Sequence, residues 1–479
     1  MRPNILMLFP DQWRADWLGA IGDLPLRTPY IDALIARGIS FGRAWTPSPL
    51  CAPARSCFAT GKGYGRAPVG NNLMDNPPTT PTFYARLRDG GYQVANAGKS
   101  DLLKGAHSWG VDGRHRVNGT DQLAQLGFSH GFDSAGKKAA EKAYAEGFPE
   151  PYTNMLKHRG LIDRFMADYA HRSIGKEKRP MTDWMEGRIQ RPPDAYANVA
   201  PLDLPDDAYN DNFVGQAADR IIRDFDPSKP WFLIVNFPGP HEPMDVTVDM
   251  AERWKDVTFP LPCLRNNDDA ELQQDIRRRY AAMLENIDRW LGVYIETLRE
   301  LGQLDETLIV FTSDHGEMLG DRNLWKKQVP YEPSVRIPLV LAGPGVLAQG
   351  HVPDLLGNLL DLPATFLSLA GLTVPSDYEG YDLTGIMKGT DLLDGRAVTS
   401  GLGGWRAITD GRYKLLVGFR TDIFQESLQF GTLTAEIFES GSLFDLENDP
   451  LETENLWDEA IEIRGRLLAS LRSVVNLAD

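Results

Sequence analysis

The 479-residue chain has few cysteines, no long apolar run and a deficit of positive charge. Its three cysteines, Cys51, Cys57 and Cys263, cannot form a disulfide framework in a chain of this length. The apolar run at residues 5–9 is stopped by a Pro-Asp pair, so it is too short for a secretory signal or a membrane span. No later charge-free stretch reaches spanning length. We therefore expect a cytoplasmic protein with no membrane association.

The charge balance limits the class of partner. Lys and Arg number 50 and Asp and Glu number 66, so the formal net charge is −16. This balance argues against a nucleic acid or an anionic membrane as the main partner. Hydrophobic residues make up 42% of the chain, so it can bury a large core. An anionic substrate would need a local cluster of Lys and Arg to overcome the negative field.

Several short apolar runs end abruptly in polar residues, which is typical of strands buried on both faces of a parallel sheet. Between these runs lie amphipathic stretches of helix length, at residues 207–225 and 275–301. This alternation predicts an α/β fold with a large, mostly parallel central sheet flanked by helices. Open sheets of this kind place ligands beyond the carboxyl ends of their strands. The runs span residues 4–9, 231–237 and 307–311, and the polar residues after them include Asp11, Gln12, His241, Asp314 and His315.

The pattern predicts two units, a catalytic α/β domain at residues 1–375 and a smaller C-terminal α+β subdomain at 376–479. A glycine-rich passage separates them, and a strand is expected at residues 412–417. An apolar stripe near the C-terminus predicts a closing helix that packs on a small antiparallel sheet. Residues 105–205 have weak periodicity and are interpreted as a variable excursion that shapes the pocket entrance, or as a structural flap. The stripe consists of Leu467, Leu468, Leu471, Val474 and Val475.

Two carboxylates and an imidazole at strand ends suit a divalent cation. Asp11, Asp314 and His315 supply hard oxygen and borderline nitrogen ligands, and Gln12 can add an amide oxygen. The alternative is that the two aspartates cap the helices that follow them. Two such strand ends in one sheet, the second followed by histidine and glycine, favour the metal.

Cys51 lies in a proline-flanked polar segment. Pro53 suits the first turn of a helix, which places Cys51 just before the helix N-terminus. The helix dipole and free N–H groups there favour an anionic nucleophile or ligand. Arg55, four residues on, returns to the same side of the helix. The alternative, a small buried hydrophobe, is what we assign to Cys57 and Cys263.

The segment Cys51-x-Pro53-x-Arg55 resembles the signature of the sulfatase family, in which this cysteine is converted after translation to formylglycine. Six further segments resemble family motifs in the family's order and cover nearly the whole chain. The resemblance implies the alkaline-phosphatase-like fold and the hydrolysis of an organic (aryl or alkyl) sulfate monoester to alcohol and inorganic sulfate. These segments are Pro3-Asn4-Ile5 leading to Asp11, Gly98-Lys99, Pro240-His241-x-Pro243, Asp314-His315-Gly316-Glu317, Lys327 with Tyr331-Glu332 and Arg336-Ile337-Pro338-Leu339, and Leu443-Phe444-Asp445-Leu446 with Asp449-Pro450-x-Glu452.

The resemblance also implies roles for single residues. A metal-bound formylglycine hydrate derived from Cys51 would attack sulfur, and His241 would protonate the leaving oxygen. Arg55, Lys99 and Lys327 would offset charge on the transferred group. The expected ion is calcium or manganese, with magnesium or zinc as alternatives. Its implied ligands are Asp11, Gln12, Cys51 in its modified form, Asp314 and His315.

The implied partners are a small-molecule sulfate ester and, during maturation, a formylglycine-generating enzyme. A homodimer or higher homo-oligomer is left open, because the C-terminal helix and the long excursion each offer a contact surface. The identity of the alcohol has no readable code in residues 105–205.

Departures from the family pattern keep an alternative open. The Asp11-Gln12 pair replaces two adjacent aspartates, and Asn72 falls near a substrate-contacting asparagine, as in choline sulfatases and phosphonate monoester hydrolases. Lys99, which phosphonate hydrolases are expected to lack, favours sulfate. A phosphonate monoester or phosphodiester hydrolase on the same scaffold is therefore the second hypothesis. A non-catalytic binder of sulfated ligands would follow only if the cysteine stayed a thiol.

Asp101 stands where many sulfatases have a histidine. We predict that it contacts the substrate, by accepting a hydrogen bond or by binding a cationic leaving group. It could instead accept a hydrogen bond from Lys99.

Overall fold

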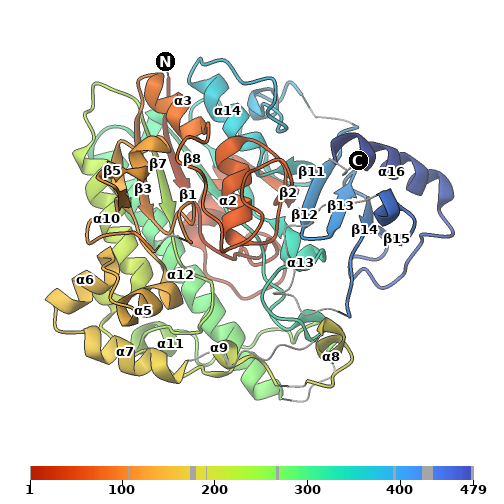
Figure 1. Ribbon diagram of the computed structural model, residues 1–479, viewed down its shortest axis with the longest axis horizontal. Coiled ribbons are helices and arrows are strands. Elements are labelled where there is room, and N and C mark those ends of the chain that lie inside the picture. The colour runs from red at the N-terminus through yellow and green to blue at the C-terminus, as the bar shows by residue number, and fades with distance from the viewer. Residues whose placement is uncertain are drawn as a thin grey trace.

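The structure is a computed structural model that describes residues 2–105, 107–172, 180–189, 191–265, 269–391, 395–422 and 435–475. Its centre is a nine-stranded sheet in the order β11-β2-β10-β8-β1-β7-β3-β6, with β9 paired to β2 (Figure 1). The predicted fold class, a large and mostly parallel sheet with helices and a smaller C-terminal antiparallel sheet, is confirmed. The strands are β1 (Asn4–Leu8), β2 (Ile39–Trp45), β3 (Gln93–Gly98), β6 (His130–Asp133), β7 (Trp231–Asn236), β8 (Thr307–Thr312), β9 (Arg336–Ile337), β10 (Leu339–Ala342) and β11 (Gly350–Asn358).

The five strands β8, β1, β7, β3 and β6 run parallel, and β10 runs antiparallel to both β8 and β2. The three apolar runs of the sequence became β1, β7 and β8. Their side chains alternate between two cores, with Leu6 and Leu8 in one and Ile5 and Met7 in the other. Burial on both faces explains why these strands read as continuous apolar runs.

Helices cover both faces of the sheet. One core contains apolar residues of α1, α10, α11 and α12, and the opposite core contains those of α2, α3, α14 and α15. α12 begins at Ala270, five residues earlier than expected, because the Asp269 side chain caps it by accepting from the N–H of Leu272. These helices are α1 (Pro29–Arg37), α2 (Cys51–Thr60), α3 (Phe83–Asp89), α10 (Asn210–Asp224), α11 (Val248–Glu252), α12 (Ala270–Glu300), α14 (Asp361–Leu369) and α15 (Thr384–Met387). Short 3₁₀ turns are η1 (Asp206–Ala208), η2 (Leu304–Glu306), η3 (Asp321–Asn323) and η5 (Ala435–Phe438).

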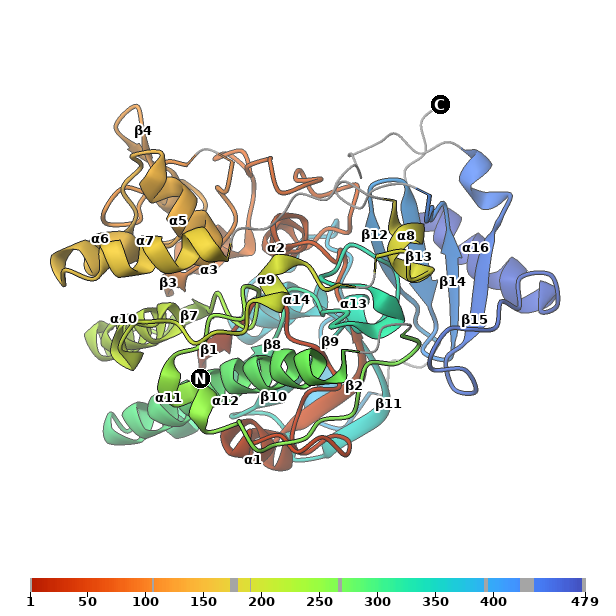
Figure 2. The ribbon, with the colours of Figure 1, turned by 90° about the horizontal axis from the view of Figure 1, so that it is seen from below.

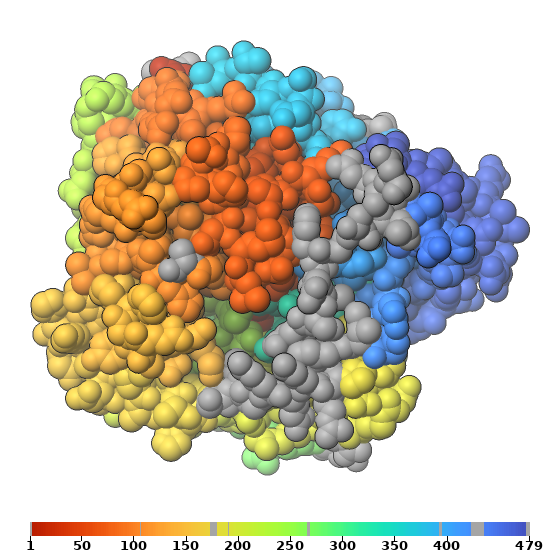
Figure 3. Space-filling view, viewed as in Figure 1, coloured from red at the N-terminus to blue at the C-terminus, as the bar shows by residue number. Residues whose placement is uncertain are grey.

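Residues 105–205 are more regular than the weak periodicity indicated. They contain the edge strand β6 and several short helices whose apolar residues join the main core. Short helices give few turns over which a period can be read, which explains the weak signal. In Figure 3 the gold surface of this segment borders a depression whose other side is the orange surface of the first hundred residues. The elements are β4 (Arg116–Val117), β5 (Thr120–Asp121), α4 (Gln122–Gln125), α5 (Lys137–Ala145), α6 (Pro151–His158), α7 (Ile162–His171), α8 (Met181–Met185) and α9 (Asp194–Ala197).

A four-stranded antiparallel sheet, β12-β13-β14-β15, forms the C-terminal part together with α16 (Figure 2). Leu467 and Leu471 of α16 are buried against one face of this sheet, as the apolar stripe predicts. The other face packs on Trp45 and Val335 of the larger part. The boundary at residue 375 stays a prediction. The elements are β12 (Val398–Leu402), β13 (Trp405–Thr409), β14 (Tyr413–Val417), β15 (Gly441–Asp445) and α16 (Ile461–Val474).

Within the part of the chain that the structure describes, no helix has the length and apolar character needed to cross a bilayer.

Candidate active site

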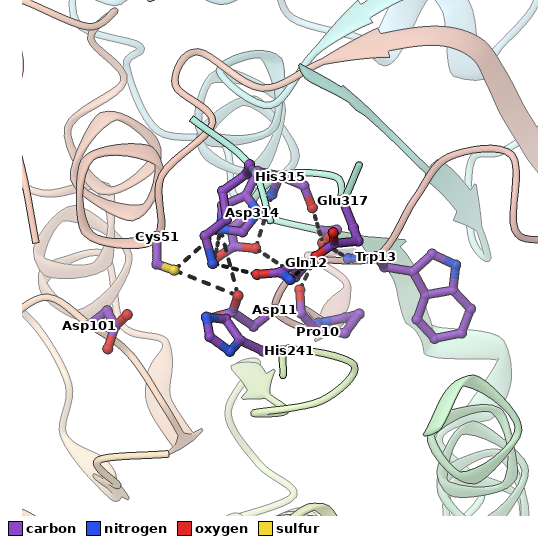
Figure 4. A network of polar contacts seen from close by, with 12 residues as sticks. Pro10, Asp11, Gln12, Trp13, Cys51, Asp101, His241, Asp314, His315 and Glu317 are labelled. Carbon is purple, nitrogen blue, oxygen red and sulfur yellow. Dashed lines mark hydrogen bonds and ion pairs between the residues drawn. The ribbon is translucent and has the colours of Figure 1, made fainter. Parts of the chain in front are cut away.

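The carboxyl ends of β1 and β8 meet the start of α2 at one buried cluster (Figure 4). Asp11, Cys51, Asp314 and His315 each direct one donor atom inward, and these atoms all lie within 4.8 Å of one another. Cys51 Sγ is 3.2 Å from His315 Nε2 and 3.6 Å from Asp11 Oδ1. Cys51 is the first residue of α2 rather than the residue before it, so the expected position was wrong by one residue.

The donor set fits a divalent cation. His315 Nδ1 lies 3.0 Å from the carbonyl oxygen of Gly316, which can only accept, so Nδ1 carries the proton. The unprotonated Nε2 then faces carboxylate oxygens of Asp11 and Asp314, each 3.6 Å away. Burial lowers the pKa of His315, which keeps the ring neutral. A lone pair held against two buried carboxylates is the arrangement in which a cation is bound.

Arg55 lies next to both carboxylates of the cluster, those of Asp11 and Asp314. Its Nε donates to Asp314 Oδ2 at 2.9 Å, and its Nη1 donates to the carbonyl oxygen of Lys99 and to Asn236 Oδ1. Its Nη2 is buried without a hydrogen bond and lies 3.7 Å from Asp11 Oδ2. The guanidinium therefore fixes Asp314 by a hydrogen bond, and its Nη2, which lies near Asp11, can meet another acceptor.

Three lysines surround the cluster from the β3 side and the segment after β8. Lys99 Nζ bonds Asp11 Oδ2, and Lys327 Nζ bonds the side-chain oxygen of Gln12. Burial and Asp11 oppose ionisation of the Cys51 thiol, yet Lys327, Lys99 and Lys104 bring its pKa below the ordinary value. Burial likewise opposes ionisation of Asp11, but Lys99 and the other cations hold its pKa well below normal. The cluster thus favours an anion at position 51 in a protein of net negative charge.

Asp101 lies between two of these lysines. Its Oδ2 is 2.6 Å from Lys104 Nζ and 3.2 Å from Lys99 Nζ. Although burial opposes ionisation, these ammonium groups lower the pKa of Asp101 to about 2. Both ammonium groups contact Oδ2, so lysines within the protein compensate the charge of Asp101. A substrate contact by Asp101 stays a prediction.

The side-chain amide of Gln12 is held by residues outside the donor cluster. Its backbone N–H donates to Asp314 Oδ1 at 3.0 Å, and its side-chain Nε2 donates to Glu242 and Glu317. The amide oxygen, the atom suited to a metal, accepts from Lys327. A role for Gln12 as a metal ligand stays a prediction.

The sequence did not single out the buried acids behind Gln12. Glu317 Oε2 accepts from the hydroxyl of Tyr196 at 2.6 Å, and burial together with Glu242 raises the pKa of Glu317 to about 7. Glu242 and Glu317 fall inside the histidine and aspartate motifs, which was the available signal. Tyr196 comes from the weakly periodic excursion, where no signal was present.

His241 lies beside Asp11 at the open side of the cluster (Figure 4). Its Nδ1 is 2.7 Å from the carbonyl oxygen of Glu242, so Nδ1 donates and Nε2 is the free atom. Its side chain is 25% exposed, whereas Asp11 and His315 are fully buried.

Asn72 reaches the site indirectly. Its Oδ1 accepts from the N–H of Ala52 at 3.0 Å, which satisfies one free donor at the start of α2. A direct contact with the substrate stays a prediction.

Of the other two cysteines, Cys57 is buried as expected, but Cys263 is exposed, so its assignment as a buried hydrophobe was wrong. It lies in a surface loop where its own backbone N–H donates to Asp321.

Comparison with known proteins agrees with this fold. Residues 3–372 match the family model described as Sulfatase, and residues 320–475 match that of the N-sulphoglucosamine sulphohydrolase C-terminal region. The chain is 28% identical to an arylsulfatase of Clostridium perfringens over 95% of its own length and 90% of the relative's. It is 27% identical to a choline-sulfatase of Rhizobium meliloti over 95% and 82% of the two chains.

Among solved structures, the phosphonate monoester hydrolase of Agrobacterium radiobacter superposes with a TM-score of 0.74 at 21% identity, over 99% of this chain and 95% of that one. This likeness bears on the fold alone. The family match covers most of the chain, and the chain belongs to the sulfatase family, the enzymes that hydrolyse sulfuric esters.

Proposed function

We propose that this enzyme hydrolyses an organic sulfate monoester, aryl or alkyl, with a nucleophile derived from Cys51. The observation that carries the proposal is the buried cluster of Asp11, Cys51, Asp314 and His315, on which Lys99 also converges. This cluster brings together the two things that such a reaction needs, a candidate nucleophile at position 51 and cations for the transferred group.

Two groups come from outside the unmodified chain. A divalent cation, calcium or manganese with magnesium or zinc as alternatives, would be held by Asp11, Asp314, His315 and residue 51, and it supplies Lewis-acid charge when bound. Formylglycine at position 51, made by a formylglycine-generating enzyme, supplies a hydrated aldehyde with two oxygens on one carbon.

The chain's own side chains supply positioning and proton transfer. The buried ammonium groups of Lys99 and Lys327 would attract the sulfuryl oxygens, and Arg55 holds the Asp314 carboxylate by a hydrogen bond. His241 presents Nε2, the atom that would carry a proton to the leaving oxygen.

The second hypothesis, a phosphonate monoester or phosphodiester hydrolase, is favoured by the Asp11-Gln12 pair and by the position of Asn72 in the sequence. Lys99, buried in the site, favours sulfate. The test compares kcat/KM for an aryl sulfate with that for the matching aryl phosphonate monoester, and we expect the sulfate to be preferred.

Replacing His241 with alanine should affect poor leaving groups most. A general acid contributes roughly 10²–10⁴-fold when the leaving oxygen needs a proton, and little when the leaving group is already stable as an anion. We expect the His241→Ala variant to lose far more kcat/KM on phenyl sulfate than on 4-nitrophenyl sulfate. Equal losses across a series of substituted phenyl sulfates would remove His241 from the acid role.

A further inference from the structure

The loop that carries His241 is held from outside the active site by the first residue of α5. Lys137 is 4% exposed, and its Nζ lies 2.7 Å from Asp245 Oδ1 and 3.3 Å from the carbonyl oxygen of Pro243. One residue, Glu242, separates Pro243 from His241 in the sequence. The ammonium therefore bonds the backbone immediately beyond His241 and the side chain at the loop's end.

This ion pair lies in a core without access to water. Asp245 is 1% exposed, and its second oxygen accepts from the hydroxyl of Tyr169 on α7. Lys137 Nζ also lies 3.1 Å from the sulfur of Met283 and 5.7 Å from the centroid of the Tyr209 ring, and its charge favours the ionised form of the buried Asp211 carboxyl. A buried ion pair is a poor source of stability, because desolvation offsets the attraction. Its role here is to position the loop, because a single ammonium group holds both the Pro243 carbonyl and the Asp245 side chain.

The other side of the loop has its own anchors. The N–H of Gly239 donates to Asp211 Oδ1 at 2.8 Å, and the N–H of Asp11 donates to the carbonyl oxygen of Gly239 at 3.2 Å. His241 thus lies midway between one anchor at Gly239 and a second at Pro243. Without Lys137, the carbonyl of Pro243 would lose its donor, and the second half of the loop would keep the bond from the N–H of Met244 to the carbonyl oxygen of Ala195.

The residue before Lys137 contacts the other side of the site. Gly136 has a φ of +81°, and a Cβ built on it would lie 2.8 Å from Lys99 Cδ. The start of α5 therefore adjoins the stem of Lys99 and the His241 loop at once. Through this turn, the excursion at residues 105–205 supports both the Lys99 side chain and the His241 loop.

We propose that Lys137 is a positioning residue that holds the His241 loop in the orientation from which His241 reaches the leaving oxygen. The proposal rests on the proposed function, because it assigns Lys137 an effect only through His241. A misplacement of about 1 Å in a catalytic group can cost on the order of 10²-fold in rate.

The test is the Lys137→Met variant, which keeps the length of the side chain and removes its charge. We expect kcat/KM for phenyl sulfate to fall about 10²-fold, with a much smaller loss on 4-nitrophenyl sulfate, as for a misplaced general acid. In a His241→Ala background the same substitution should add no further leaving-group dependence, since residues that act through one group are not additive. Lys142→Met is the matched control, because Lys142 lies on α5 with its side chain 60% exposed, and it should leave both substrates unchanged.

A folding defect is handled by a second variant. If Lys137→Met fails to fold because Asp245 is left unpaired, the double variant Lys137→Met/Asp245→Asn removes both charges and should show the same leaving-group signature. Equal losses on both substrates, losses that add to those of His241→Ala, or wild-type rates would each overturn the proposal. If the wild-type enzyme prefers a phosphonate monoester, the proposed function fails instead, and the leaving-group signature of Lys137→Met still decides the positioning role on that substrate.

Discussion

Replacing Cys51 with alanine is expected to lower kcat/KM for an aryl sulfate on the order of 10⁴-fold or more, as the loss of a nucleophile does in other hydrolases. The reason is the position of the thiol, because Sγ lies 3.2 Å from His315 Nε2 and 3.6 Å from Asp11 Oδ1. Cys51 begins α2, and alanine is a good helix former, so the melting temperature should change little. The measurement is the rate of sulfate release together with a thermal unfolding curve.

Cys57 provides the matched control for this experiment. It lies in the same helix and is also fully buried, but burial raises its thiol pKa well above normal, and it packs with Ala67 and Leu360. Cys57→Ala should retain activity. Full activity of purified Cys51→Ala protein would contradict the mechanism, whereas a wild-type protein that binds sulfate esters without turnover would identify a binder rather than an enzyme.

Removing the divalent cation is expected to abolish turnover and to lower the melting temperature. Without a cation, the buried carboxylates of Asp11 and Asp314 face the lone pair of His315, and Arg55 and Lys99 compensate their charge in part. A bound ion present at about a thousandfold above its Kd stabilises the fold by roughly 4 kcal/mol, which chelation would remove. The measurement combines metal analysis, kcat/KM and thermal unfolding before and after EDTA, followed by addition of calcium, manganese, magnesium or zinc.

The Asp314→Asn variant controls for effects of the chelator itself. Because it lacks one carboxylate ligand, EDTA should not shift its melting temperature, and its metal content should be far below one ion per chain. A metal-free wild-type enzyme with full activity would contradict the assignment of the cluster as a metal site.

Much of the site follows from one rule about open α/β sheets. The apolar runs that became β1, β7 and β8 end at Asp11, at the His241 loop and at Asp314, and parallel strands bring these ends to one edge. The proline at the first turn of α2 fixed the place of Cys51 to within one residue.

Other features of the site depend on contacts between distant segments. Gln12 bonds Glu317 across 305 residues, and Tyr196 bonds Glu317 across 121. No local periodicity encodes such pairs. The short helices α5 and α7 were missed because nine and ten residues give too few turns for a period to be read, although their buried residues lie on one face and join the main core. The sequence therefore gave no signal that would single out Lys137, at the start of α5.

The most direct test of the central claim is a pair of kcat/KM values. The enzyme, produced together with a formylglycine-generating enzyme and loaded with manganese or calcium, is assayed with 4-nitrophenyl sulfate and with a 4-nitrophenyl phosphonate monoester. The ratio measures differential binding of the two transition states by the same residues. We predict that sulfate is favoured by at least about tenfold, because the chain has Lys99, a residue that the family resemblance leads us to expect in sulfatases and not in phosphonate hydrolases. A preference for the phosphonate would contradict this account, because the features shared with phosphonate hydrolases, Asp11-Gln12 and Asn72, would then outweigh Lys99.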